Sequence, residues 1–198
     1  MLIGLDFDNT IVCYDRAIVR LADKLLKLPS DLPRTKLAIR DYLRSVNRES
    51  EWTAFQGELY GPGMSYAEPF DHSVETMQLL KAAGYSLCII SHRSLRPYAG
   101  PTYDLHVAAR AWIDENLASD VIVNSQAFFY ETRDQKIAAI GALECDVFVD
   151  DLPIIIENGV FPSTCQPILF DPDNFHVKVN SVRITHWSQL PMMLPSFQ

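Results

Sequence analysis

Two pairs of carboxylates each follow a short apolar run of the chain. Asp6 and Asp8 follow the first run, and Asp150 and Asp151 follow a later one. Because alternate residues of an extended chain point to the same side, Asp6 and Asp8 face the same way. Four like charges brought together repel one another unless a cation lies among them. Oxygen ligands without His or Cys favour Mg²⁺, which can position a phosphate oxygen against a carboxylate nucleophile.

Simpler explanations exist for each carboxylate pair taken alone. An Asp-x-Asp pair is more often a turn or a helix cap, and an Asp-Asp pair after a strand is as often a cap as a ligand. Ser91 ends another apolar run, however, and Lys136 opens the helical pattern that leads into the strand before Asp150. In open parallel sheets functional groups collect beyond the carboxyl ends of the strands. All of these groups could therefore share one rim, which favours a site.

The elements that must position these groups alternate along most of the chain. The runs expected as strands are Met1–Leu5, Tyr85–Ile90, Val121–Val123, Val147–Val149 and Pro167–Phe170. Helical periodicity marks the stretches around 73–83, 105–113 and 137–143. Nearly continuous apolar strands separated by amphipathic helices predict a parallel sheet covered on both faces. The predicted fold class is therefore α/β, with a Rossmann-like, doubly wound, mainly parallel sheet.

Residues 14–72 interrupt this alternation. They contain no strand-like run, only helical patterns over 17–28 and 37–46. We therefore predict an α/β core made of residues 1–13 and 73–198, with residues 14–72 as a helical insertion. Four aromatic side chains on the return from this insertion are expected to pack in its interior rather than to line a pocket; they are Trp52, Phe55, Tyr60 and Tyr66.

Charge is unevenly distributed along the 198 residues, whose formal net charge is −8. Residues 16–48 hold nine basic and three acidic side chains, a balance of +6 that leaves −14 for the rest. Arg40, Arg44 and Arg48 share one helix face, and we hypothesise that they attract an anionic substrate. For any single one of these arginines an ordinary solvated polar face is the better explanation. The acidic total argues against nucleic acid or an anionic membrane as a whole-surface partner.

The composition is that of an ordinary globular protein, with 48% hydrophobic and 21% charged residues. Its four cysteines form no C-x-x-C pair, which argues against a disulfide framework and against a zinc site built on cysteine. The sequence has no secretory signal pattern and no apolar stretch near the ~20 residues of a membrane helix. We therefore expect a cytoplasmic location with reduced thiols and no membrane partner.

The residues at the strand ends resemble the four motifs of the haloacid dehalogenase-like (HAD) hydrolase superfamily. The stretch LIGLDFDNTIV is similar to its first motif, D-x-D-x-T, and Ser91 in LCIISHR is similar to its second. Lys136 resembles the third motif, and the acidic pair in VFVDD resembles the fourth. Each motif is short, but the four occur in family order as far as Asp151. The resemblance implies a HAD-like core in which the 14–72 insertion is a small helical cap.

The same resemblance implies a role for each of these side chains. Asp6 would be the nucleophile that becomes an aspartyl-phosphate, and Asp8 would act first as general acid and then as base. Ser91 would hydrogen-bond a phosphoryl oxygen, and Lys136 would neutralise charge on the nucleophile and the phosphoryl group. The implied Mg²⁺ ligands are Asp6, the backbone carbonyl of Asp8, Asp150 and, directly or through a neighbour, Asp151.

Three further residues lie beside these motifs. Arg93 lies two residues past Ser91, as in some phosphatases of the superfamily, and is expected to bind substrate together with Ser91, His92 and Lys136. A loop histidine bonded to the backbone explains His92 equally well. Thr10 is expected to fix the loop after the first strand rather than to touch substrate.

Asp8 distinguishes between reactions known in the superfamily. Cleavage of a phosphate ester leaves an alkoxide that benefits from a proton, whereas cleavage of a carbon–halogen bond does not. We therefore predict a Mg²⁺-dependent phosphatase that acts on a small anionic phosphorylated metabolite. A phosphotransferase and a non-catalytic binding protein of the same fold remain alternatives, and a 2-haloacid dehalogenase is disfavoured. The sequence favours no particular phosphate ester and no oligomeric state.

Overall fold

The computed structural model describes residues 1–117 and 119–194, and the chain divides into two compact units. The core unit comprises Met1–Val12, Pro69–Arg93 and Ile113–Gln198. The helical unit comprises Cys13–Glu68 and Ser94–Trp112. Its first segment begins one residue before the insertion expected at 14–72 and ends four residues before the expected end, whereas its second segment is one that we had assigned to the core.

Contacts made by residues 94–112 explain why this segment belongs to the helical unit. The Trp112 indole N–H donates to the Ala67 carbonyl over 3.0 Å, and the Tyr103 hydroxyl donates to Glu58, also over 3.0 Å. A Cβ added at Gly57 would lie 2.8 Å from the Pro97 side chain, so that the glycine allows the two segments to approach closely. Such long-range pairings leave no periodic signal in the sequence.

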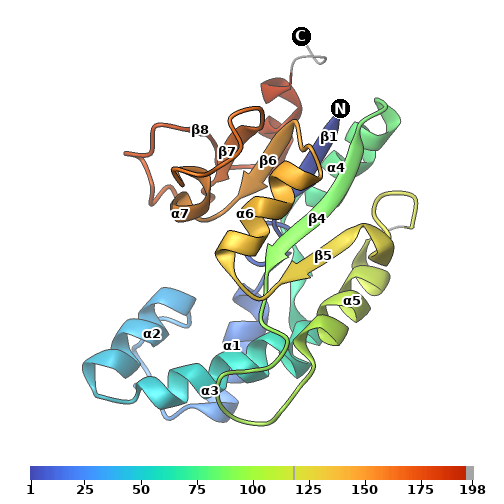
Figure 1. The fold of residues 1–198 in the computed structure, drawn as a ribbon. Coiled ribbons are helices and arrows are strands. Elements are labelled where there is room, and N and C mark those ends of the chain that lie inside the picture. The colour runs from blue at the N-terminus through green and yellow to red at the C-terminus, as the bar shows by residue number, and fades with distance from the viewer. Residues whose placement is uncertain (118, 195–198) are drawn as a thin grey trace. The chain divides into compact units, whose positions relative to one another are not determined.

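The core unit is built on a parallel sheet of six strands among the described residues (Figure 1). The strands lie in the spatial order β5-β4-β1-β6-β7-β8, and every neighbouring pair is parallel. Their bounds are β1 Leu2–Leu5, β4 Ser86–His92, β5 Ala127–Tyr130, β6 Val147–Asp150, β7 Gln166–Phe170 and β8 Val182–Ile184. The chain reverses its direction of winding between β1 and β6, which is the place where open α/β sheets bind ligands. The predicted fold class is confirmed.

One predicted strand is wrong. The run Val121–Val123 is not a strand, and the edge strand β5 lies farther along the chain, at Ala127–Tyr130. Val121 and Ile122 are nevertheless buried, so their apolar character reflects packing in a loop. Three of the four β5 residues are only half-buried, as befits an edge strand. Hydrophobicity alone therefore could not distinguish the buried loop from the edge strand.

Helices cover the sheet, with α6 (Arg133–Ala142) in front of it and α4 (Ser73–Ala82) behind it in Figure 1. A capping box formed by Thr132 and Gln135 starts α6 and thereby fixes where Lys136 emerges. The remaining short elements of this unit are α7 Pro153–Ile156, η2 Asn124–Gln126, η3 Trp187–Gln189 and η4 Pro191–Met193. No helix among the described residues is long and apolar enough to cross a membrane.

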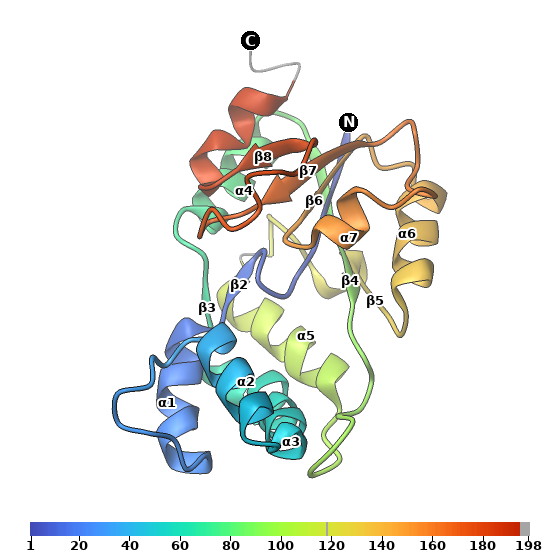
Figure 2. The same ribbon diagram turned by 90° about the vertical axis from the view of Figure 1, so that its left-hand side faces the viewer.

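The helical unit contains the two helices expected in the insertion and a third that we did not predict (Figure 2). Its elements are α1 Asp15–Leu25, α2 Lys36–Ser45, α3 Glu49–Tyr60, η1 Pro62–Tyr66 and the start of α5 Leu105–Asn116. The short strands β2 Val12–Cys13 and β3 Glu68–Pro69 pair where the chain enters and leaves this unit.

The unpredicted helix α3 carries aromatic residues expected in the interior. Trp52 and Phe55 are buried with ring centroids 5.9 Å apart, which confirms the packing role, while Tyr60 and Tyr66 are half-buried. Trp52, Phe55 and Leu59 follow helical spacing and share one face. The glycine at position 57 lowers helix propensity in the middle of this pattern, and this concealed the helix in the sequence.

Candidate functional site

The centre of the site lies at the carboxyl ends of the two central strands of the core unit. Asp6 directly follows β1, and its backbone N–H donates to the Val149 carbonyl over 2.8 Å. Asp150 ends β6, the neighbouring strand, and is fully buried. The two carboxylates thus flank the point where the winding of the sheet reverses, as their strand-end positions in the sequence had indicated.

Lys136 joins these two carboxylates. Its buried ammonium donates to Asp150 Oδ2 over 2.6 Å and also to Asp6 Oδ1. The second oxygen of Asp150 accepts the Leu152 backbone N–H over 2.9 Å. A single ammonium therefore binds Asp6, which is 130 positions away along the chain, and Asp150, which is 14 positions away.

The electrostatics of this cluster leave negative charge incompletely compensated. Burial raises the pKa of Asp6 to about 7; Lys136 opposes this rise, and Asp150 and Asp8 add to it. Burial also disfavours the charged form of Lys136, but Asp150 and Asp6 outweigh burial and raise the pKa of the ammonium above its usual range. Lys136 therefore stays charged, but a single ammonium shared between two buried carboxylates does not neutralise both.

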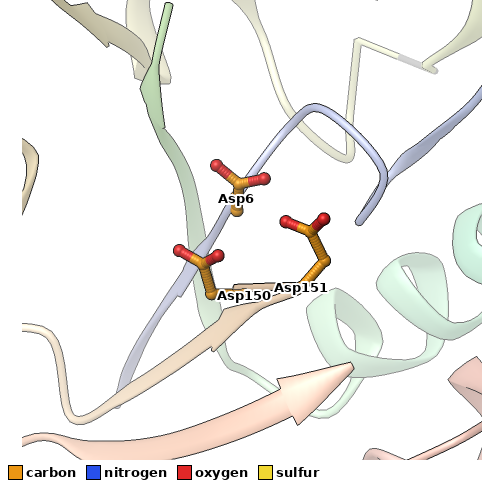
Figure 3. Close-up of side chains that lie close together, drawn as sticks. All are labelled: Asp6, Asp150 and Asp151. Atoms are coloured by element: carbon orange, nitrogen blue, oxygen red, sulfur yellow. The ribbon is translucent and has the colours of Figure 1, made fainter. Parts of the chain in front are cut away.

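A third carboxylate completes a set that suits a hard cation. Asp6, Asp150 and Asp151 each offer an oxygen, and these oxygens all lie within 4.8 Å of one another. Figure 3 shows the three side chains extending to the same side from the ends of β1 and β6. An all-oxygen set of this kind fits Mg²⁺ in preference to softer metals.

Asp8 has a different partner from the other carboxylates of the site. Arg93 Nη1 donates to Asp8 Oδ1 over 2.6 Å and to Oδ2 over 2.8 Å. Arg93 is buried, its guanidinium lies 5.8 Å from the centre of the Phe7 ring, and its backbone N–H donates to the Tyr130 carbonyl over 2.8 Å. The structure thus places Arg93 against the predicted general acid, a pairing 85 residues apart that the sequence did not indicate.

Ser91 and His92 lie side by side near the end of β4 and differ in their surroundings. The Ser91 hydroxyl is buried and has no hydrogen-bond partner among the described residues. Buried hydroxyls are normally satisfied, so this one has capacity to spare for a ligand. The His92 Nε2 lies 3.1 Å from the Glu131 carbonyl, and burial lowers the pKa of the imidazole. The backbone bond allowed for in the sequence analysis is therefore present.

Thr10 contacts the loop after β1 as expected. Its hydroxyl donates to Asp6 Oδ2 over 3.3 Å, and its carbonyl accepts the indole N–H of Trp187 over 3.0 Å. Sequence reasoning missed Trp187 as a support of this loop, because the contact spans 177 residues and involves a backbone carbonyl. A buried Trp near the end of the chain gave no indication of its partner.

Comparisons with known proteins place the fold. No family model and no curated protein matches the chain. Among solved structures, a predicted phosphoglycolate phosphatase from Haemophilus somnus is similar at 16% identity and TM-score 0.60, covering 97% of this chain and 96% of its own. Protein Tyrosine Kinase A of Mycobacterium tuberculosis is similar at 15% identity and TM-score 0.65, with 98% and 97% covered. A HAD phosphatase from Thermococcus onnurineus is similar at 15% identity and TM-score 0.58, covering 98% of this chain and 97% of its own.

These likenesses extend over almost the whole length of each chain at low identity. They confirm the resemblance noted in the sequence at the level of fold: the chain has the haloacid dehalogenase-like fold.

Proposed function

We propose that this chain, which has the fold of the haloacid dehalogenase-like hydrolases, is a Mg²⁺-dependent phosphatase acting on a small phosphate monoester. The observation that carries the proposal is the buried Lys136 ammonium bonded to both Asp6 and Asp150, with Asp151 within reach of the same centre. A carboxylate nucleophile, a fixed cation and an oxygen-rich metal set are the groups that phosphoryl transfer requires.

The proposed reaction proceeds in two halves through Asp6. In the first half an Asp6 oxygen forms a bond to phosphorus while the bond from phosphorus to the ester oxygen breaks, and the leaving oxygen takes a proton from Asp8. In the second half Asp8 accepts a proton from water, whose oxygen bonds to phosphorus. The bond from phosphorus to Asp6 then breaks, which releases inorganic phosphate and restores the carboxylate.

Other groups of the chain would hold the phosphoryl group during these steps. Lys136 offsets negative charge at Asp6, and the unpartnered Ser91 hydroxyl is available to donate to a phosphoryl oxygen. Asp6, the Asp8 carbonyl, Asp150 and Asp151 would hold Mg²⁺, which when bound supplies positive charge that draws the phosphate oxygens toward Asp6. His92 remains a proposed substrate contact.

The proposed mechanism requires Arg93 to move away from Asp8 when substrate binds. Both oxygens of Asp8 accept from the Arg93 guanidinium, which holds them away from a leaving oxygen. A phosphate dianion competes for the same guanidinium, so substrate binding would draw Arg93 toward phosphate and release Asp8 to act on the leaving oxygen. This accommodates both the substrate-binding role proposed for Arg93 and the acid role proposed for Asp8.

The helical unit is proposed to be the small cap that selects the substrate. One similar structure is that of a predicted phosphoglycolate phosphatase, which supports a small phosphorylated metabolite as the substrate class. We also propose a cytoplasmic location, in which thiols stay reduced.

A phosphotransferase is the second candidate, because one similar structure is named a protein tyrosine kinase. The two activities differ only in whether water or another hydroxyl accepts the phosphoryl group. Product analysis in the presence of a competing alcohol separates them: inorganic phosphate alone indicates a phosphatase, and a phosphorylated alcohol indicates a transferase.

The test is hydrolysis of p-nitrophenyl phosphate and of a panel of phosphorylated metabolites, with and without Mg²⁺. We expect activity that requires Mg²⁺ and is lost in Asp6→Asn. Asp173→Asn is the matched control, since Asp173 is an exposed carboxylate in a loop. Wild-type rates in Asp6→Asn would refute the nucleophile, and no hydrolysis of any ester by the wild type would refute the function.

A further inference from the structure

Two exposed histidines of the core unit lie ring against ring, away from the carboxylate cluster in sequence. His72 precedes α4 and His186 precedes η3, and their ring centroids are 4.8 Å apart with planes tilted by 54°. The ring nitrogens of His72 have no hydrogen-bond partner among the described residues. No short motif in the sequence indicates this pair, because the two histidines are more than a hundred residues apart.

An aromatic cluster beneath the two rings fixes their backbones. Phe70, two residues before His72, packs edge-on against Phe170 with centroids 4.9 Å apart. Trp187, directly after His186, lies 6.0 Å from the same Phe170 ring. Both histidines are therefore attached to side chains that share one buried partner. His72 also holds a left-handed backbone, φ 61°, which is uncommon for a residue other than glycine.

The spacing of the rings suits two ligands of one metal ion. A Zn–N bond is about 2.0–2.1 Å long, which puts an imidazole centroid roughly 3.2 Å from the ion. Two such rings at a near-tetrahedral angle have centroids roughly 5 Å apart, close to the 4.8 Å observed here.

His186 has in addition the contact that usually orients a metal-bound imidazole. Its Nδ1 lies 2.7 Å from the Ser188 hydroxyl oxygen. This oxygen can accept a hydrogen bond from a protonated Nδ1, which leaves Nε2 unprotonated and able to bind a metal. The Ser188 backbone N–H is also directed at Nδ1, but over a long 3.4 Å, so this weaker contact does not fix the tautomer.

We propose that His72 and His186 form a surface site for a borderline transition-metal ion, of which Zn²⁺ is the representative. Imidazole ligands select such ions over Mg²⁺, so this site and the carboxylate cluster take different metals. No third His, Cys, Asp or Glu of the described residues joins the pair, and water completes the coordination.

Metal binding here ties together two segments that support the loop after β1. Trp187 donates to the Thr10 carbonyl, and the Phe70 backbone N–H donates to the Ile11 carbonyl over 2.9 Å. An ion that bridges His72 and His186 therefore fastens the segments on either side of this loop. Because the ion binds the folded chain, it raises the thermal unfolding temperature.

The experiment is a calorimetric titration of tag-free protein with Zn²⁺ in excess Mg²⁺, followed by Cu²⁺ electron paramagnetic resonance to detect nitrogen ligands. The variants are His72→Asn, since Asn tolerates a left-handed backbone, and His186→Asn, since Asn still caps η3. His176→Asn is the matched control, because His176 is exposed and outside the pair.

We expect one Zn²⁺-binding event that weakens at least about tenfold in each pair variant and remains in the control. Ser188→Ala should weaken it by roughly tenfold. The copper spectrum should show two nitrogen ligands in the wild type and in the control, but not in the two pair variants. Equal Zn²⁺ affinity in the wild type and both pair variants, or no Zn²⁺ binding by the wild type, overturns the proposal. Neither result depends on phosphatase activity.

Discussion

The ion pairs of the two units differ in burial and in how their charges balance. In the core unit one ammonium, with 2% of its side chain exposed, serves two buried carboxylates. In the helical unit Arg44 and Glu49, 49% and 56% exposed, pair one to one. Exposed pairs in water contribute little, whereas breaking a buried pair leaves an uncompensated charge. This difference is consistent with the catalytic role that we propose for the core cluster.

The basic side chains of the insertion are mostly paired with acidic residues of the same unit. The three arginines thought to attract substrate each donate to an acidic neighbour: Arg40 to Asp41, Arg44 to Glu49 and Arg48 to Glu51. Two of these acids lie just beyond residue 48, where the basic stretch ends. The helical unit as folded carries eleven basic and nine acidic residues, a balance of only +2. Its surface charge is largely paired internally.

The largest expected effect is that of removing the shared cation. Lys136→Met leaves Asp6 and Asp150 without their common donor, which should cost about 3–5 kcal/mol of unfolding free energy and abolish turnover. Urea denaturation of metal-free protein measures the loss. Lys24→Met, at an exposed position of α1, is the control and should unfold like the wild type. A Lys136→Met protein as stable as the wild type would show that the cluster needs no cation.

The next effect is on the pH dependence of stability. The pKa of Asp6 is raised to about 7 in the folded chain, so between the unfolded value and about 7 the folded state binds the extra proton. Metal-free protein should therefore lose stability as pH rises through this window, by at most about 4 kcal/mol. Thermal unfolding in a chelator from acidic to mildly alkaline pH measures this.

Two controls sharpen the pH experiment. Asp6→Asn cannot ionise and should lose this part of the pH dependence, and Mg²⁺ should restore stability to the wild type above pH 7. A pH profile that is the same in Asp6→Asn and in the wild type would assign the titration to another group.

A smaller effect is expected at the pair between the buried Arg93 and the half-buried Asp8. Arg93→Ala frees Asp8 from its partner and removes a proposed phosphate contact, so kcat/KM should fall by roughly 10²-fold. Steady-state kinetics with p-nitrophenyl phosphate give the value. Arg96→Ala, at an exposed arginine, serves for comparison and should retain full activity. Unchanged kinetics in Arg93→Ala would remove Arg93 from the site.

The smallest effect is expected in the helical unit. Replacing Arg40, Arg44 and Arg48 together by Gln should leave the salt dependence of kcat/KM unchanged and alter its value less than about twofold, because each arginine already has an exposed partner. Kinetics over a range of ionic strength test this. A large fall in kcat/KM that high salt abolishes would restore the hypothesis that this surface attracts the substrate.

Local signals account for what the sequence predicted correctly. Strand-end carboxylates, the helix start before Lys136 and the apolar strands depend on residues close together in the chain, and they placed Asp6, Asp150 and Lys136 on one rim. The pairing of Arg93 with Asp8 and that of His72 with His186 depend on the order in which strands lie side by side. Helix α3 was missed because Gly57 weakens the helical pattern of its sequence. Strand β5 was missed because the apolar loop at Val121–Val123 has the sequence character of a strand.

We propose that Asp6 carries the phosphoryl group during turnover. Protein mixed with a radiolabelled phosphate ester and Mg²⁺ is quenched in acid before turnover is complete, digested, and mapped by mass spectrometry. We expect label on the peptide that contains Asp6, and loss of this label after the unlabelled ester is added as a chase. Active turnover with no label on that peptide at any quench time would rule out a phosphorylated Asp6.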